Sequence, residues 1–201
     1  MYINIKDKKS LNRFYRLLPI YRTFLFRFTK FEIKENKYDI SSIIEALNIK
    51  SRRKRLEYIF DTACDEIDLY YKGLNICGFK GGRCKSQLLS KSKNTNGCCG
   101  LCVYVTDKGC PTRNVSCKLF VCDIVKKKYK PIKFKDIKIL KLLSLRQKLI
   151  ITTDCLSTRE QAINDLYTGL LIVGYSRMLF RLIINTIILV RRKKHEQKRK
   201  K

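Results

Sequence analysis

Histidine is almost absent from this chain, and its shortage removes several classes of site. The single histidine, His195, lies in a strongly basic segment at the end of the sequence. A mixed cysteine-histidine zinc finger, a histidine-rich catalytic zinc site and a cysteine-histidine nucleophile pair are therefore not expected from a folded part of the chain. Any acid-base role would fall to carboxylates, Tyr or Lys.

Acidic residues are also few. The 201 residues include 17 Asp and Glu against 45 Lys and Arg, which gives a formal net charge of +28. An excess of this size attracts polyanions, so nucleic acid and an anionic membrane surface are the two partners that the charge suggests. A hydrophobic content of 45% is enough for a sizeable core, which excludes a disordered chain.

An export signal is lacking as well. The N-terminal stretch MYINIKDKKS has neither an apolar segment nor a small-residue cleavage site. We therefore expect a cytoplasmic protein whose cysteines are reduced.

Cysteine, by contrast, is abundant: eight of the ten cysteines fall within residues 77–122. In a reducing compartment, clustered thiols are more often metal ligands than a disulfide framework, so we favour metal over disulfides or passive thiols. Cys64 and Cys155, outside this cluster, are interpreted as buried thiols. The expected ligands are Cys77, Cys84, Cys98, Cys99, Cys102, Cys110, Cys117 and Cys122.

The spacing of these thiols is irregular, and no pair of CxxC knuckles occurs. Four thiolates suit a closed zinc site or an iron-sulfur cluster, and both cofactors stay open. The adjacent Cys98 and Cys99 are hard to wrap around one ion. We expect them to serve different centres, or one of them to be structural.

The residues around the cluster resemble the YkgJ-like cysteine-cluster proteins, a family described as zinc- or iron-chelating. The similar features are Gly97 before the cysteine pair, then Cys102-Val103-Tyr104-Val105 with Asp107, Gly109 and Cys110, then Arg113 ahead of Cys117-Lys118-Leu119-Phe120-Val121-Cys122. The resemblance covers roughly a quarter of the chain. It implies metal chelation without a settled reaction, and it implies that Cys84 or Cys77 supplies a further ligand.

The fold class that we expect is mainly α: a small helical protein around a loop-rich, cysteine-clustered metal module. We divide the chain into a basic aromatic helical region (1–50), an amphipathic helix (51–73), the cysteine-rich metal module (74–125), a helical region (126–190) and a disordered basic tail (191–201).

In the first region, apolar residues recur at helical spacing, which predicts a helix broken near Pro19. They are Phe14, Leu18, Tyr21, Leu25 and Phe28. We interpret its aromatic side chains as core rather than as a stacking surface for bases. Ser42 and Glu45 form a capping-box pattern that predicts a second short helix.

Residues 51–73 have the strongest helical pattern. The apolar stripe consists of Leu56, Phe60, Cys64, Ile67 and Tyr71, and Gly73 supplies a C-terminal stop. A neighbouring carboxylate row consists of Glu57, Asp61, Asp65 and Asp68. Such a row could hold a metal or act in acid-base chemistry, but we favour a role in offsetting nearby Arg and Lys.

Further helices are predicted between residues 126 and 190. An amphipathic one is suggested by Phe134, Ile137, Leu140 and Leu145, and Ser157 with Glu160 forms a second capping-box pattern.

Residues 169–190 are apolar enough to raise the question of a membrane span. Arg177, Arg181 and Asn185 form a polar stripe four residues apart, so we favour a buried core helix with a wet edge.

The function that these patterns favour is metal binding in a cysteine-cluster protein of unknown cellular role. Two alternatives stay open: a nucleic-acid-binding module with a metal-stabilised scaffold, in which Phe14 and Tyr21 are available for stacking, and an iron-sulfur-dependent enzyme. The sequence identifies no small-molecule substrate.

Overall fold

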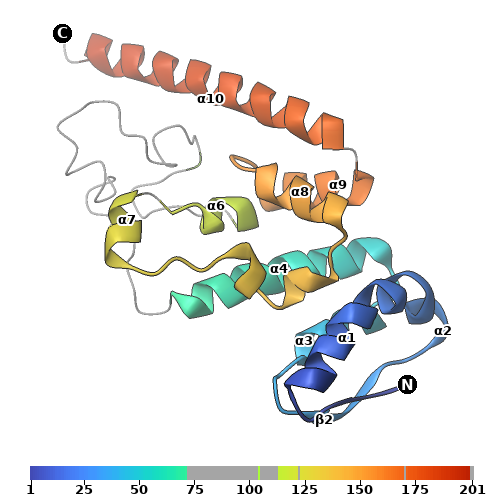
Figure 1. Ribbon diagram of the computed structural model, residues 1–201. Helices are drawn as coiled ribbons and strands as arrows, with labels where there is room; N and C mark the ends of the chain where they lie inside the picture. The colour runs from blue at the N-terminus through green and yellow to red at the C-terminus, as the bar shows by residue number, and fades with distance from the viewer. Residues whose placement is uncertain (72–103, 105–112, 122, 170, 200–201) are drawn as a thin grey trace.

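The chain is mainly helical, as predicted, in the residues that the computed structural model describes, namely 1–71, 104, 113–121, 123–169 and 171–199 (Figure 1). Most of the expected metal module lies outside these ranges. The elements are β1 (Tyr2–Ile5), α1 (Lys8–Ile20), the π-helical turn η1 (Tyr21–Leu25), α2 (Phe26–Phe28), β2 (Glu32–Asn36), α3 (Ser41–Asn48), α4 (Arg52–Tyr70), α6 (Val115–Leu119), α7 (Asp123–Lys128), the 3₁₀ turns η3 (Phe134–Asp136) and η4 (Ile139–Leu142), α8 (Leu145–Thr153), α9 (Arg159–Thr168) and α10 (Leu171–Arg199).

Helix α4 runs through the middle of the molecule and contacts α3, α6, α9 and η4 (Figure 1). It begins where the Ser51 side chain accepts a hydrogen bond from the Lys54 amide. All members of its predicted apolar stripe are buried, and Cys64 points into the core as expected. This helix is therefore the scaffold on which the other elements are placed.

The N-terminal region contains a small sheet that the sequence did not predict. Strand β1 pairs in parallel with β2, with Tyr2 opposite Glu32, and α1 lies in the connection between them. The side chains of Ile3 and Ile5 alternate into the core. A capping box of Asp7 and Ser10 starts α1.

The regular α-helix ends next to Pro19, as predicted, but the chain remains helical beyond this point. Helix α1 includes Pro19, and the backbone then changes to the π-helical turn η1. Proline cannot donate a backbone hydrogen bond, so a change of helical pitch next to it accommodates the missing donor.

The aromatic side chains of this region are core, as we favoured. Phe14 and Tyr21 are both buried, with ring centroids 5.8 Å apart. The alternative in which they stack on bases is wrong, because neither ring is accessible. The stripe does not extend to Phe28, whose side chain is 86% exposed.

The two predicted capping boxes need correction, although both helices exist. Helix α3 begins after Ile40 without a side-chain cap, so Ser42 lies inside the helix. The box that starts α9 consists of Thr158 and Gln161, one residue later than predicted. Ser157 is instead fully buried.

The single helix expected from Phe134 to Leu145 is wrong. The structure has the two short turns η3 and η4, and α8 begins only at Leu145, after the Ser144 cap. Ile137 and Leu140 are buried, but Leu145 is 81% exposed. Apolar residues in short turns against a core can imitate helical spacing.

Helix α10 lies across α8 and presents the opposite face from the one we predicted (Figure 1). Its polar residues Arg181 and Asn185 face the molecule, whereas Leu179, Phe180 and Ile183 point outward, Phe180 with 64% of its surface exposed. The prediction of a buried core helix with a polar edge in water is therefore wrong for the described residues of α10. Within the described residues, no helix combines the length and the apolarity that crossing a bilayer requires.

The basic tail is not disordered where it is described, since α10 continues to Arg199. Its Arg, Lys, Glu and Gln residues have high helix propensity, and neither Gly nor Pro interrupts them. A helix that is already nucleated by the preceding residues propagates at little cost.

Candidate metal module and its anchor

One of the eight expected ligands, Cys117, lies in the part of the chain that is described. It belongs to α6, which packs against α4 and α8. The other seven expected ligands lie outside the described residues; these are Cys77, Cys84, Cys98, Cys99, Cys102, Cys110 and Cys122.

The buried side chain of Asn114 fixes the start of α6. Its Oδ1 accepts a hydrogen bond from the Cys117 amide at 2.9 Å, which makes Asn114 the N-cap. Its Nδ2 donates to the Asp154 carbonyl at 2.9 Å and to Ser157 Oγ at 2.8 Å. One asparagine thus joins the end of the cysteine-rich segment to the loop between α8 and α9.

The sulfur of Cys117 is also oriented by that loop. The backbone N–H of Leu156 donates to Cys117 Sγ at 3.3 Å, and Leu156 has a left-handed backbone with φ of 59°. Leucine rarely adopts this conformation, so the loop is held in it by its surroundings. A hydrogen bond donated to sulfur favours the thiolate, which is the form that binds metal.

Cys64 and Cys155 have different surroundings. Cys64 is fully buried on α4, and burial raises the pKa of its thiol to about 12. Cys155 is half-buried, and burial likewise raises its pKa. The interpretation as a buried thiol is confirmed for Cys64, whereas Cys155 is only partly buried. Burial favours the neutral form of both thiols.

The carboxylate row of α4 pairs with cations, as we favoured. Arg113, just before α6, places Nη2 2.8 Å from Asp65 Oδ1, and Lys118 pairs with Asp68. These two contacts tie α6 to α4 in addition to its apolar packing.

Two further acids of the row complete the pattern. Arg159 forms a bidentate ion pair with Asp61, with Nη2 2.6 Å from Oδ2 and Nε 2.7 Å from Oδ1. Glu57 pairs with Arg53. The row therefore joins α4 to α6 and α9, and Arg159 is a positioning residue that the sequence patterns missed.

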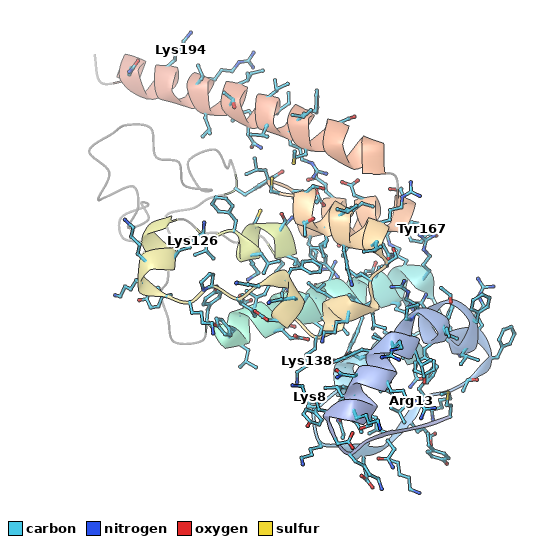
Figure 2. All side chains as sticks on the ribbon, viewed as in Figure 1. Lys8, Arg13, Lys126, Lys138, Tyr167 and Lys194 are labelled. Carbon is cyan, nitrogen blue, oxygen red and sulfur yellow. The ribbon has the colours of Figure 1, made fainter. Side chains whose placement is uncertain are left out.

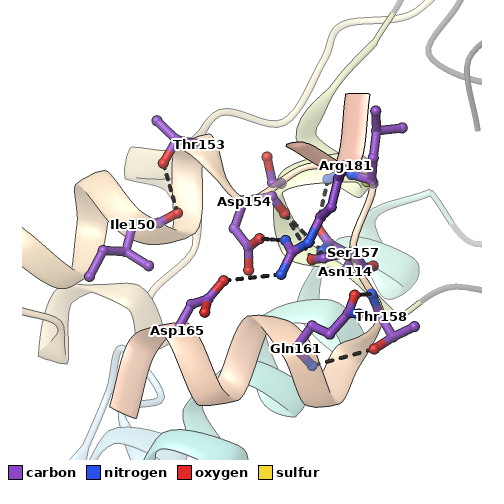
Figure 3. A network of polar contacts seen from close by, with 12 residues as sticks. Asn114, Ile150, Thr153, Asp154, Ser157, Thr158, Gln161, Asp165 and Arg181 are labelled. Atoms are coloured by element: carbon purple, nitrogen blue, oxygen red, sulfur yellow. Dashed lines mark hydrogen bonds and ion pairs between the residues drawn. The ribbon is translucent and has the colours of Figure 1, made fainter. Parts of the chain in front are cut away.

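Arg181 of α10 contacts two buried carboxylates, those of Asp154 and Asp165 (Figure 3). Its Nη1 pairs with Asp154 Oδ1, and its Nη2 lies 3.1 Å from Asp165 Oδ2. Burial raises the pKa of Asp154 despite the opposing effect of Arg181. The Arg181 pairs fix α10 to the same loop that orients Cys117.

Within the described residues, no three His, Cys, Asp or Glu side chains are grouped to hold a metal. A metal would instead draw its donors from the thiols of the module, and the oriented sulfur of Cys117 fits such an all-thiolate set. The described residues thus include one candidate ligand, Cys117, and the two residues that hydrogen-bond to it, Asn114 and Leu156.

No protein-family model, curated protein or solved structure matches this chain. The resemblance to the YkgJ-like family stays a prediction.

Proposed function

We propose that this chain is a metal-binding protein whose cysteine module holds zinc or iron, the latter as an ion or an iron-sulfur cluster. The observation that carries the proposal is the placement of Cys117 by the Asn114 cap and by the Leu156 N–H. Such outer contacts orient metal ligands. Together with the density of thiols in residues 77–122, they favour ligation over passive burial.

Elemental analysis after anaerobic purification tests this proposal. We expect tightly bound zinc or iron, because structural zinc sites contribute roughly 10 to 16 kcal/mol of binding free energy. A visible absorption band that bleaches on reduction would identify an iron-sulfur cluster. A content below about half an equivalent of transition metal per chain overturns the proposal.

Substitutions then test which thiols bind. We expect Cys117→Ser and Cys122→Ser to lose metal and to destabilise the module, whereas Cys155→Ser changes little because it preserves the backbone of the Leu156 loop. Equal metal content in the three variants contradicts the ligand assignment.

A second candidate function, binding to nucleic acid, is favoured by the distribution of charge. Glu57, Asp61, Asp65 and Asp68 of α4 are paired with arginine or lysine, yet the chain has a net charge of +28. Phosphate backbones release counterions when they bind such a surface, which gives affinity without sequence preference. A steep fall of RNA or DNA affinity with rising salt supports this function, and the absence of binding at low salt contradicts it.

A further inference from the structure

A pocket of about 340 Å³ lies between the start of α4, the η1 turn and the start of α8. Four arginines line it, and they come from three separate segments of the chain: Arg22, Arg52, Arg55 and Arg146. Its apolar lining is provided by Leu56, Ile59, Leu142 and Leu143, all of which are buried. The volume is within the range of small-ligand sites.

Two of the arginines are held in place by the protein. Arg55 lies over the Phe26 ring, 4.0 Å from its centroid, and donates to the Ile49 carbonyl at 3.3 Å. Arg22 donates to the Leu142 carbonyl at 2.9 Å. Both side chains are half-buried, so little rotamer freedom remains for them to lose when they bind a ligand.

The other two arginines are exposed. Arg52 lies over Tyr167, 5.2 Å from the ring centroid, near the end of α9 where Figure 2 labels this tyrosine. Gly169 follows with a left-handed φ of 67°, and a Cβ there would lie 4.0 Å from Arg52 Nη2. Arg146 projects from the first turn of α8.

Among the described residues, none of the four pocket arginines forms an ion pair with a carboxylate, and no Asp or Glu lines the pocket. Burial, and then the nearby charges of Arg52 and Arg27, lower the pKa of Arg55. Burial, and then Arg22, lower the pKa of Lys148. Among the residues that the structure describes, the positive charge around the pocket is therefore not compensated by a carboxylate.

The neighbouring Arg53 shows the contrast. It pairs with Glu57 and Glu160, whereas Arg52 and Arg55, three residues apart on one face of α4, turn to the pocket. Because successive residues of a helix point in different directions, Arg53 forms ion pairs while Arg52 and Arg55 line the pocket. The first turn of α8 adds the positive end of a helix dipole near Ser144 and Gln147.

We infer that this pocket binds a phosphate ester, namely a backbone phosphate of a single-stranded nucleic acid. Planar guanidinium groups match phosphate oxygens in pairs, and two of these groups are already fixed before binding. This inference rests on the second candidate function and names the site that would perform it.

A pair of matched double variants tests the site. Arg52→Gln/Arg146→Gln removes the two exposed arginines of the pocket, and Arg13→Gln/Arg16→Gln removes two exposed arginines of α1 that do not line it. Figure 2 shows Arg13 well apart from Tyr167. Both variants lose the same charge, and thermal unfolding checks that each is folded.

The probes are a fluorescent single-stranded RNA 12-mer, measured by anisotropy across a salt series, and a nucleoside 5′-monophosphate, measured by calorimetry. We expect the pocket variant to bind the RNA about tenfold more weakly, with a shallower salt dependence, and the α1 variant to change by less than about threefold. Binding of the monophosphate without the RNA, lost in the pocket variant, supports the phosphate site but assigns it to a nucleotide.

Two results overturn the inference. If the native protein binds the RNA and both variants weaken it equally, the pocket is not the site, and the nucleic-acid function survives as a general attraction. If the native protein binds neither probe at low salt, the site and the second candidate function both fail.

Discussion

The guanidinium of Arg181 lies between Asp154 and Asp165, and all three side chains are largely removed from solvent. Removing one member of a buried set of charges costs more than the set contributes, because the remaining charges lose their compensation. Asp154 already has a raised pKa through burial, and Arg181 is the largest influence that opposes this. Arg181 is therefore one of the contacts that hold α10 in position, beside the buried Asn185.

We predict that Arg181→Gln lowers the free energy of unfolding at pH 7 by about 3 kcal/mol. The loss of Arg181 raises the pKa of Asp154 further, so the folded state retains a proton that the unfolded state releases near pH 3.9. Stability of the variant should then fall as pH rises through the folded pKa and recover at acid pH. Urea unfolding at several pH values measures this.

The matched control is Arg191→Gln, an exposed position on the same helix. It should change stability by less than about 0.5 kcal/mol at any pH. Equal losses in the two variants would show that the buried pairs contribute nothing specific.

The thiol of Cys64 gives a second prediction at this scale. With a pKa of about 12, it is almost entirely protonated at pH 8, and its side chain is inaccessible. We expect iodoacetamide to leave Cys64 unmodified in the folded protein and to label it in guanidinium, as followed by peptide mass mapping. Labelling of Cys64 at the rate of free glutathione in the folded state would contradict its burial.

Among the elements, those with a long and unbroken pattern were the ones that the sequence predicted well. Helix α4 has its apolar stripe in one stretch of chain, so local information was sufficient to predict the helix and its buried face. The partners of its acids, Arg113, Lys118 and Arg159, come from distant segments. For α10 it was not, because the carboxylates that turn Arg181 inward belong to α8's end and to α9. The direction of an amphipathic helix depends on its partners.

Capping shows the same limit at a finer level. Ser157 and Thr158 are both good caps by type, and only the fold distinguishes them: the buried Asn114 side chain binds Ser157 Oγ, which leaves Thr158 for the helix. Ser42 and Glu45 were predicted to form the capping box of α3, but this helix already begins at Ser41. Glu45 accepts a hydrogen bond from the Tyr58 hydroxyl and takes no part in capping.

We predict that Thr158→Ala destabilises the protein by about 1 kcal/mol, since the hydroxyl accepts a hydrogen bond from the Gln161 amide and alanine cannot accept one. Ser42→Ala, at the cap that the sequence suggested, should cost less than about 0.5 kcal/mol because this residue lies inside α3. Thermal or urea unfolding of both variants measures the difference. The reverse order of losses would restore the sequence-based assignment.

For the whole molecule, the candidate sites were predicted to different depths. The cysteine cluster is visible in the sequence, but the supports of Cys117 come from the α8–α9 loop, about 40 residues further along. Of the arginine pocket, the sequence shows only the basic run Arg52-Arg53-Lys54-Arg55 at the start of α4. Arg22 and Arg146 join it from distant segments, so only the fold brings the four charges together.

Helix α10 has its exposed apolar residues and its dense basic segment at different positions along its length. Leu179, Phe180 and Ile183 are exposed in its first half, and the basic residues follow from Arg191 onward. A cluster of lysines and arginines beside an exposed apolar helix surface is attracted to anionic lipid headgroups. Nucleic acid and an anionic lipid surface are therefore both partners that the end of this helix has to be tested against.

The last prediction is that deleting residues 191–201 leaves the fold and the metal content intact while weakening binding to polyanions. The segment has eight Lys or Arg against the single acid Glu196, so it exerts a screened attraction independent of sequence. The exposed side chains of Arg191, Lys194 and Gln197 show no burial that deletion would remove. RNA and anionic-vesicle binding of the full and shortened chains, at low and moderate salt, measures the effect.

A variant with the tail's Lys and Arg changed to Gln keeps the length and the helix propensity, so it separates charge from helical extension. If charge alone acts, this variant should match the deletion for both ligands. Loss of vesicle binding alone would point to the lipid surface, because the apolar face of α10 needs the adjoining charges to hold it against anionic headgroups. Unchanged affinity for RNA and vesicles would eliminate the tail as a docking element and identify it as a solvated extension of α10.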